Sequence, residues 1–150
     1  MAIQTIRTCD KCGQKDTGMK LIIAGTRTIP ESQAARLISK AAHHWELWPD
    51  VVLSGESGGV DSAAKKLCGC WERRVEYRGF PADWETHGKA AGPIRNGEMV
   101  KEGDALLLIW NGKSPGSKNI LNQALKAGLP VYELQVIAST ETFIRHEAKK

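Results

Sequence analysis

The sequence is organised around Ser54-Gly55-Glu56-Ser57-Gly58-Gly59-Val60-Asp61, which follows the apolar run of residues 51–53 and precedes an amphipathic segment. A strand, a glycine-rich turn and a helix in that order form a pocket for a phosphate. Glycines let the backbone approach the ligand, and the amides at a helix N-terminus favour an anion. We therefore expect the glycines and serines of this stretch to cradle a phosphate. A tight strand-to-helix turn without a ligand would have the same pattern.

Apolar runs alternate with helical stripes along the rest of the chain. Strands that alternate with helices imply right-handed crossovers and a parallel sheet. The sequence therefore predicts an α/β fold: a Rossmann-like three-layer sandwich with a five-stranded parallel sheet, its strands in the order 3-2-1-4-5 when numbered along the chain. The runs that predict these strands lie at residues 20–24, 51–53, 74–78, 105–110 and 131–134.

Two further glycine-rich turns follow predicted strands, Gly25-Thr26-Arg27 and Gly112-Lys113-Ser114-Pro115-Gly116-Ser117. Ligands of parallel α/β sheets bind beyond the carboxyl ends of the strands, near the switch in strand order. We therefore expect the three turns to meet at one edge. There Arg27 would clamp a phosphate or a ribose through its planar guanidinium, the alternative being a solvated loop arginine. The 112–117 turn would form a second phosphate cradle. Ser117 would also cap the helix that follows.

Residues outside these turns add further candidates for ligand binding. Arg95 and Asn96 follow a Gly-Pro pair at a predicted helix start and would face the same edge. Asp61 would bond a ribose hydroxyl or would only favour the helix dipole, and both readings stay open. The remaining candidates are Asp83, Lys89, Trp84 and Trp110, of which the two tryptophans would stack on a base.

The composition fits one domain that binds a small anionic ligand. The chain has 150 residues and a formal net charge of +4, with its Lys and Arg residues spread along the sequence. No apolar run approaches the ~20 residues of a membrane span, and the N-terminus lacks the apolar region of a signal peptide. We therefore expect a cytoplasmic protein without membrane contact. Small domains of this kind pair through exposed helices, so we also expect a homo-oligomer.

The first residues contain a possible metal-binding turn. Cys9 and Cys12 lie in a Cys-Asp-Lys-Cys-Gly sequence of the kind used in zinc knuckles. The alternative is a lead-in segment with two exposed thiols. A tetrahedral zinc site would need two more ligands, for which the candidates are Cys68 and Cys70, or His43 and His44.

Several of these motifs together resemble one family. Gly25-Thr26-Arg27, residues 54–61, residues 80–99 and the turn at 110–117 are similar to signatures of the YspA branch of the SLOG superfamily. The resemblance implies a Rossmann-like fold that binds nucleotides or nucleotide-derived ligands. The resemblance covers roughly residues 20–135. We therefore divide the sequence into an N-terminal extension with the Cys-x-x-Cys turn at 1–19, a SLOG-like nucleotide-binding domain at 20–137 and a polar C-terminal tail at 138–150.

The wider superfamily includes LOG-type phosphoribohydrolases, which cleave a nucleoside monophosphate to a free base and ribose phosphate. Arg95-Asn96-Gly97-Glu98-Met99 resembles a segment of that family and makes Arg95 and Glu98 the candidate catalytic residues. Asn119 and Ile120 stand where the last loop of that family has acidic residues. Breaking an N-glycosidic bond needs a carboxylate, so the sequence favours binding over cleavage.

Three functions remain open from the sequence. The first is binding of a nucleotide or nucleotide-derived signal, such as an ADP-ribose-like or cyclic nucleotide molecule, for sensing or sequestration. The alternative is an N-glycosidase of the phosphoribohydrolase kind. The third, single-stranded nucleic-acid binding, is prompted by the net charge and a distant likeness to the DprA branch. It ranks last, because no stripe of aromatic and basic residues is visible.

Overall fold

The computed structural model describes residues 7–8, 15–16, 18–56, 58–70 and 75–148. Two short strands, β1 (Arg7–Thr8) and β2 (Lys15–Asp16), pair in antiparallel register ahead of the main domain. Cys9, Cys12 and Ser57 lie outside the described residues. The zinc site and the contribution of Ser57 to a phosphate cradle therefore stay predictions.

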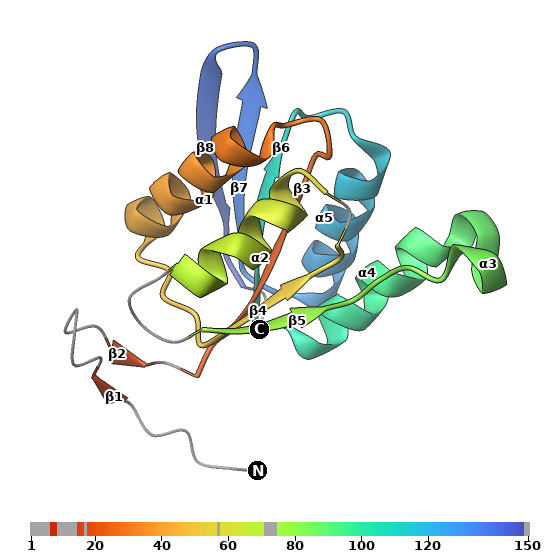
Figure 1. The fold of residues 1–150 in the computed structure, drawn as a ribbon, viewed down its shortest axis with the longest axis horizontal. Coiled ribbons are helices and arrows are strands. Elements are labelled where there is room, and N and C mark those ends of the chain that lie inside the picture. Colours follow the sequence, from red (N-terminus) through yellow and green to blue (C-terminus); the bar gives the residue numbers. More distant parts are fainter. Residues whose placement is uncertain (1–6, 9–14, 17, 57, 71–74, 149–150) are drawn as a thin grey trace.

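One six-stranded sheet forms the centre of the domain (Figure 1). Its first five strands in spatial order are parallel and lie in the predicted order. The direction in which the chain adds strands reverses between β3 and β6, which makes this pair the switch point of the sheet. The strands in spatial order are β5 (Glu76–Gly79), β4 (Val51–Ser54), β3 (Lys20–Gly25), β6 (Ala105–Trp110), β7 (Val131–Ile137) and β8 (Thr140–His146).

Strand β8 corrects the prediction that residues 138–150 form a polar tail. It pairs antiparallel with β7 from Thr140 to His146, so the sheet is mixed and has one strand more than predicted. Phe143 on this strand packs against the core, while most of its neighbours are polar. An edge strand has a solvated side, and its composition can therefore be as polar as that of a tail.

Helices cover both faces of the sheet. Right-handed crossovers carry the chain to the opposite face once the strand order reverses. In β3, Leu21 and Ile23 accordingly join the core under one pair of helices, whereas Ile22 and Ala24 join the core under the other. The domain therefore has three layers. The first pair is α1 (Glu31–Trp45) and α2 (Val60–Cys70), and the second is α4 (Ala91–Glu102) and α5 (Pro115–Ala127).

The central strand β6 anchors this arrangement. All six of its residues are buried, as its continuous apolar run predicts for a strand covered on both faces. Each buried Leu or Ile side chain contributes about 1.5–3 kcal/mol through the hydrophobic effect. The turn that follows Trp110 therefore starts from a rigid point of the sheet.

Two short helices, α3 (Trp84–His87) and η1 (Gly88–Ala90), lie between β5 and α4. They extend away from the sheet at the start of α4 (Figure 1), and we refer to residues 84–90 as the α3 arm. Among the described residues, no helix combines the length and the apolar composition that crossing a membrane requires.

Candidate functional site

A cleft of about 470 Å³ lies at the carboxyl end of β3, beside the switch point of the sheet. Its walls come from the end of β3, the first turn of α2, the α3 arm, α4 and the first turns of α5. These segments are far apart in the sequence and meet only through the topology. Parallel α/β sheets bind their ligands at this position.

The turn at residues 54–61 packs tightly against the turn that follows β3. Gly59 has a φ of +54°, and a β-carbon at this position would lie 2.7 Å from the carbonyl oxygens of Thr26 and Arg27. Thr26 is itself buried, and its hydroxyl accepts a hydrogen bond from the amide of Asn111 at 3.2 Å. Thr26 and Gly59 therefore hold the loops around the cleft together, while Arg27 reaches the cleft itself.

Arg95 lies on α4, and its side chain reaches the loops that follow β4 and β5. Its Nη1 donates to the carbonyl oxygens of Gly55 at 2.5 Å and Phe80 at 3.5 Å, and its Nε donates to Oδ1 of Asn96 at 3.0 Å. Burial lowers the pKa of Arg95 from its usual value, and the charge of Asp61 opposes that shift. An arginine remains protonated under these conditions, so Arg95 contributes a fixed positive charge to the cleft.

Asp61 is the one carboxylate among the described residues that line the cleft. It lies in the first turn of α2 and is 4% exposed. The two other acidic candidates lie outside the lining. Glu98 is exposed on α4, and Asp83 begins α3 by accepting a hydrogen bond from the amide of Thr86 at 3.1 Å, a bond that also lowers the pKa of Asp83.

The N-terminus of α5 faces the cleft through Ser114, Gly116 and Ser117. Asn111 shapes the turn before it, because its Oδ1 accepts hydrogen bonds from the amides of Lys113 at 2.9 Å and Ser114 at 3.0 Å. The first amides of a helix have no partner within the helix, and the helix dipole adds positive potential there. This end of the cleft therefore favours an anion.

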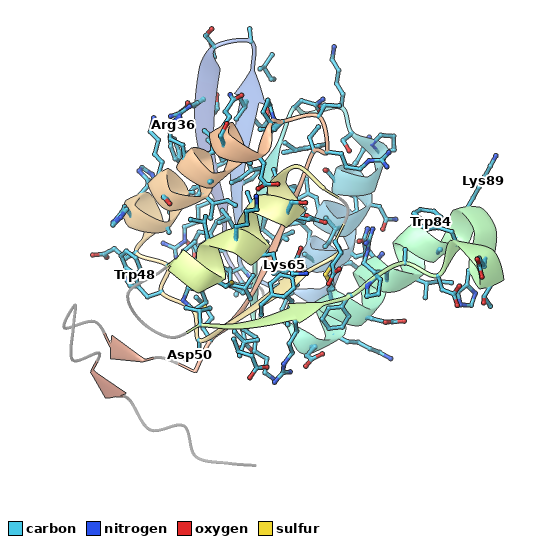
Figure 2. All side chains as sticks on the ribbon, viewed as in Figure 1. Arg36, Trp48, Asp50, Lys65, Trp84 and Lys89 are labelled. Carbon is cyan, nitrogen blue, oxygen red and sulfur yellow. The ribbon has the colours of Figure 1, made fainter. Side chains whose placement is uncertain are left out.

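The α3 arm forms the outer end of the cleft and carries Trp84 and Lys89, which Figure 2 labels. Trp84 is 58% exposed, which is unusual for so large an apolar side chain. Its ring lies against Gly92 of α4, where a β-carbon would be 3.3 Å from Cη2 of the indole. The indole therefore offers a flat apolar surface at the mouth of the cleft.

No family model matches the chain, and no solved structure matches it. The chain is similar to the Gene 61 protein of Mycobacterium phage D29, with 39% identity over 89 aligned residues that span 54% of this chain and 68% of the phage protein. The chain belongs to the family of the Gene 61 protein.

In this member of the Gene 61 family, the cleft brings together about half of the binding residues that the sequence predicts. The predicted residues that line it are Gly25, Arg27, Asp61, Trp84, Lys89, Arg95, Asn96, Ser114, Gly116 and Ser117. Those that the structure describes but places outside the lining are Thr26, Ser54, Gly55, Gly58, Gly59, Asp83, Trp110, Gly112, Lys113 and the catalytic candidate Glu98.

Trp110 corrects the prediction that it stacks on a base. It is 5% exposed and packs in the core under α4 and α5, where its Nε1 donates to Glu133 at 2.8 Å. Glu133 also accepts from Gln135 at 2.7 Å and contacts the ring of His146 at 2.9 Å. Burial alone would raise the pKa of Glu133, but the three hydrogen bonds lower it overall. Trp110 thus fixes the end of β6 instead of contacting a ligand.

Asn119 is a lining residue that the sequence does not predict as a ligand contact. It lies one helical turn after Gly116 on α5, and helical spacing is the only local signal that places it on the same face. Its hydrogen bonds with Asn96 at 3.1 Å and Gln123 at 2.7 Å join α4 to α5 behind the cleft.

The described residues contain no group of three His, Cys, Asp or Glu side chains that would hold a metal ion. Cys68 is buried in the core, and burial raises the pKa of its thiol to about 11. Its side chain packs with the apolar residues under α1 and α2, as a small apolar group would. His43 and His44 lie on the surface of α1 and make ring contacts with Trp48 and Trp45.

Proposed function

We propose that this protein binds a nucleotide or a nucleotide-derived signal molecule, such as an ADP-ribose-like or cyclic nucleotide molecule, to sense or sequester it. The observation that carries the proposal is the meeting of the α5 N-terminus, cationic side chains and an exposed tryptophan in one cleft at the switch point. A volume of about 470 Å³ lies within the range of roughly 300–1,000 Å³ that small-molecule sites occupy.

The charges of the cleft suit phosphate. Arg27, Lys89 and Arg95 line it, against the single described carboxylate of Asp61. Backbone amides at the start of α5 add donors that need no side-chain ordering. The exposed ring of Trp84 suits the flat face of a nucleobase, so both halves of a nucleotide have a matching surface.

Binding is better supported than cleavage. An N-glycosidase needs a carboxylate that stabilises the developing positive charge on the ribose or activates water. The predicted catalytic Glu98 lies outside the lining, and Asn119 and Ile120, which line the cleft, stand where the LOG-type family has acidic residues. Asp61 alone supports the enzymatic alternative, since it is a carboxylate that lines the cleft.

The resemblance to the YspA branch of the SLOG superfamily agrees with this proposal and remains a prediction. The resemblance rests on the glycine turns and on residues 80–99. Several of the residues that carry it line the cleft, among them Arg27, Trp84 and Arg95. The homo-oligomer likewise remains a prediction.

Isothermal titration calorimetry with AMP, ADP, ADP-ribose and cyclic AMP tests the proposal. We expect at least one of these ligands to bind. Arg27→Gln should lower the affinity for that ligand about tenfold or more, because a charge-assisted hydrogen bond contributes about 1.5–3 kcal/mol. Arg36→Gln is the matched control, since Arg36 is an exposed arginine of α1 that pairs with Glu141 at 3.4 Å. A folded protein that binds none of the four ligands would overturn the proposal.

A parallel assay separates binding from cleavage. Incubation of the protein with AMP and with NAD should release no free adenine or nicotinamide. Release of free base at a rate that Asp61→Asn abolishes would favour the N-glycosidase instead.

A further inference from the structure

A chain of side-chain hydrogen bonds connects Arg95, which lines the cleft, to Asn96, Asn119 and Gln123. The Nε of Arg95 donates to Oδ1 of Asn96 at 3.0 Å. The Nδ2 of Asn96 donates to Oδ1 of Asn119 at 3.1 Å. The Nε2 of Gln123 donates to the same oxygen at 2.7 Å. Three side-chain amides thus form one connected network with Arg95, and three of its four members (Arg95, Asn96 and Asn119) line the cleft.

The chemistry of the end groups fixes the direction of every bond in this chain. A guanidinium can only donate, so the atom of Asn96 that faces Arg95 must be its oxygen. The opposite atom of Asn96 must then be its NH2 group, which also lies 3.4 Å from the carbonyl oxygen of Gly116. A carbonyl can only accept, so two independent neighbours impose the same orientation on this amide.

Gln123 provides a second anchor from the other side. Its Nε2 lies 3.0 Å from the carbonyl oxygen of Pro93, which can only accept, so the NH2 group of Gln123 faces both Pro93 and Asn119. Asn96 and Gln123 therefore both present donors to Asn119. The oxygen of the Asn119 carboxamide must point toward them, and both of its acceptor sites are used.

The NH2 group of Asn119 is then the part of the carboxamide left for the cleft that this residue lines. No described residue accepts a hydrogen bond from its Nδ2. The amide cannot turn over to offer an oxygen to a ligand without breaking both of its bonds to α4 and Gln123. A lost hydrogen bond of this kind costs about 1–3 kcal/mol when its partner remains buried and unsatisfied.

We propose that Asn119 is a specificity-determining residue whose fixed NH2 group donates to an anionic phosphoryl oxygen of the ligand. This inference rests on the proposed nucleotide-binding function and names the ligand group that the residue selects. Asn119 lies on the same helix as Gly116 and Ser117, whose backbone amides are also donors. Donors gathered on the α5 side of the cleft favour a phosphoryl group over a cation.

The variant Asn119→Asp tests this assignment. An aspartate has the same shape and can still accept both amide bonds, but it places a negatively charged oxygen where the donor was. We expect Asn119→Asp to raise the dissociation constant of AMP at least tenfold at pH 8. The dissociation constant of adenosine, which lacks a phosphate, should stay within about twofold of the wild-type value. A general structural defect would weaken the binding of both AMP and adenosine.

The pH profile gives a readout that a purely structural role would not move. As the pH falls from 8 toward 5, we expect the ratio of wild-type to Asn119→Asp affinity for AMP to shrink, because the AMP phosphate takes up its second proton at about pH 6 and its repulsion by the introduced carboxylate weakens. The charged lining residues Arg27, Asp61, Lys89 and Arg95 are common to both proteins, so their own titration largely cancels in this ratio. Asn119→Ala should lower the affinity for AMP without this pH dependence.

Asn122→Asp is the matched control, because it adds the same charge to an exposed position of α5 outside the cleft. It should change AMP affinity less than threefold. Inorganic phosphate serves as a second probe. If the wild type binds no nucleotide but binds phosphate in a manner that Asn119→Asp abolishes at pH 8, the proposed function fails and the role of Asn119 stands.

Two results would overturn the inference. If the wild type binds AMP and Asn119→Asp binds it equally well from pH 5 to pH 8, the proposed function stands and the role of Asn119 is refuted. If the folded wild type binds neither nucleotides nor phosphate, both proposals are refuted.

Discussion

Replacement of Gly59 by alanine is expected to destabilise the protein far more than the same replacement of Gly58. Both residues have a positive φ, +54° for Gly59 and +86° for Gly58, which disfavours any side chain by about 1–2 kcal/mol. A β-carbon on Gly58 would meet no atom within 4 Å, whereas one on Gly59 would lie 2.7 Å from two backbone carbonyl oxygens. Such overpacking costs typically about 1–3 kcal/mol more.

The free energy of unfolding, measured by urea titration with circular dichroism, should therefore fall by about 1–2 kcal/mol in Gly58→Ala and by about 2–5 kcal/mol in Gly59→Ala. The two carbonyls that Gly59 approaches belong to Thr26 and Arg27. Relief of the contact moves Arg27, so Gly59→Ala should also weaken ligand binding, whereas Gly58→Ala should not. Equal losses of stability in the two variants would refute the view that the 54–61 turn packs against the end of β3.

The remaining predictions concern Trp84 of the α3 arm and the buried carboxylate of Glu133. Trp84→Ala should lower the affinity for a purine nucleotide, measured by calorimetry, about tenfold, because a base-stacking contact contributes about 1–3 kcal/mol. It should leave the midpoint of thermal unfolding within about 2 °C of the wild-type value, because the ring is 58% exposed. Equal affinity in wild type and variant would argue against stacking. Glu133 has a lowered pKa, so its contribution to stability is present at neutral pH and is lost as the pH falls below its ordinary value near 4.5. In urea unfolding from pH 7 to 3.5, the stability gap between wild type and Glu133→Gln should narrow with falling pH, and a constant gap would contradict this.

The order of the parallel strands was predictable because it follows from local patterns and a general rule of handedness. The run at residues 105–110 is apolar throughout, which is typical of a strand that helices cover on both faces. Right-handed crossovers then limit how the strands can be arranged. Strand β8 was not predictable in this way, since its register with β7 is fixed by an edge whose outward residues are polar.

The site was predictable to the extent that glycine turns mark the carboxyl ends of strands. Arg27 and Gly116 were placed by topology alone and line the cleft. The orientation of a side chain is a different matter. Trp110 is the last residue of β6, and from the sequence its side chain could point into the cleft or into the core. Its hydrogen bond to Glu133, 23 residues further along the chain, fixes the side chain in the core.

The role of Asn119 depends on three side chains from two helices. Its contact with Asn96 spans 23 residues of sequence, and no periodic pattern relates the two positions. Polar residues on neighbouring helices are usually solvated, so their composition carries no signal of a connected chain of hydrogen bonds. Such a network becomes visible only when the donors and acceptors are located in space.

The most direct test of the central claim is an NMR titration of the isotopically labelled protein with AMP and ADP-ribose, in which the backbone amide resonances are assigned. The account predicts that the amides of Gly25, Gly116 and Ser117 and the indole N–H of Trp84 shift together and saturate with one dissociation constant. Shifts that are absent for both ligands, or that are confined to α1 and the β7–β8 hairpin, would contradict a nucleotide site in this cleft.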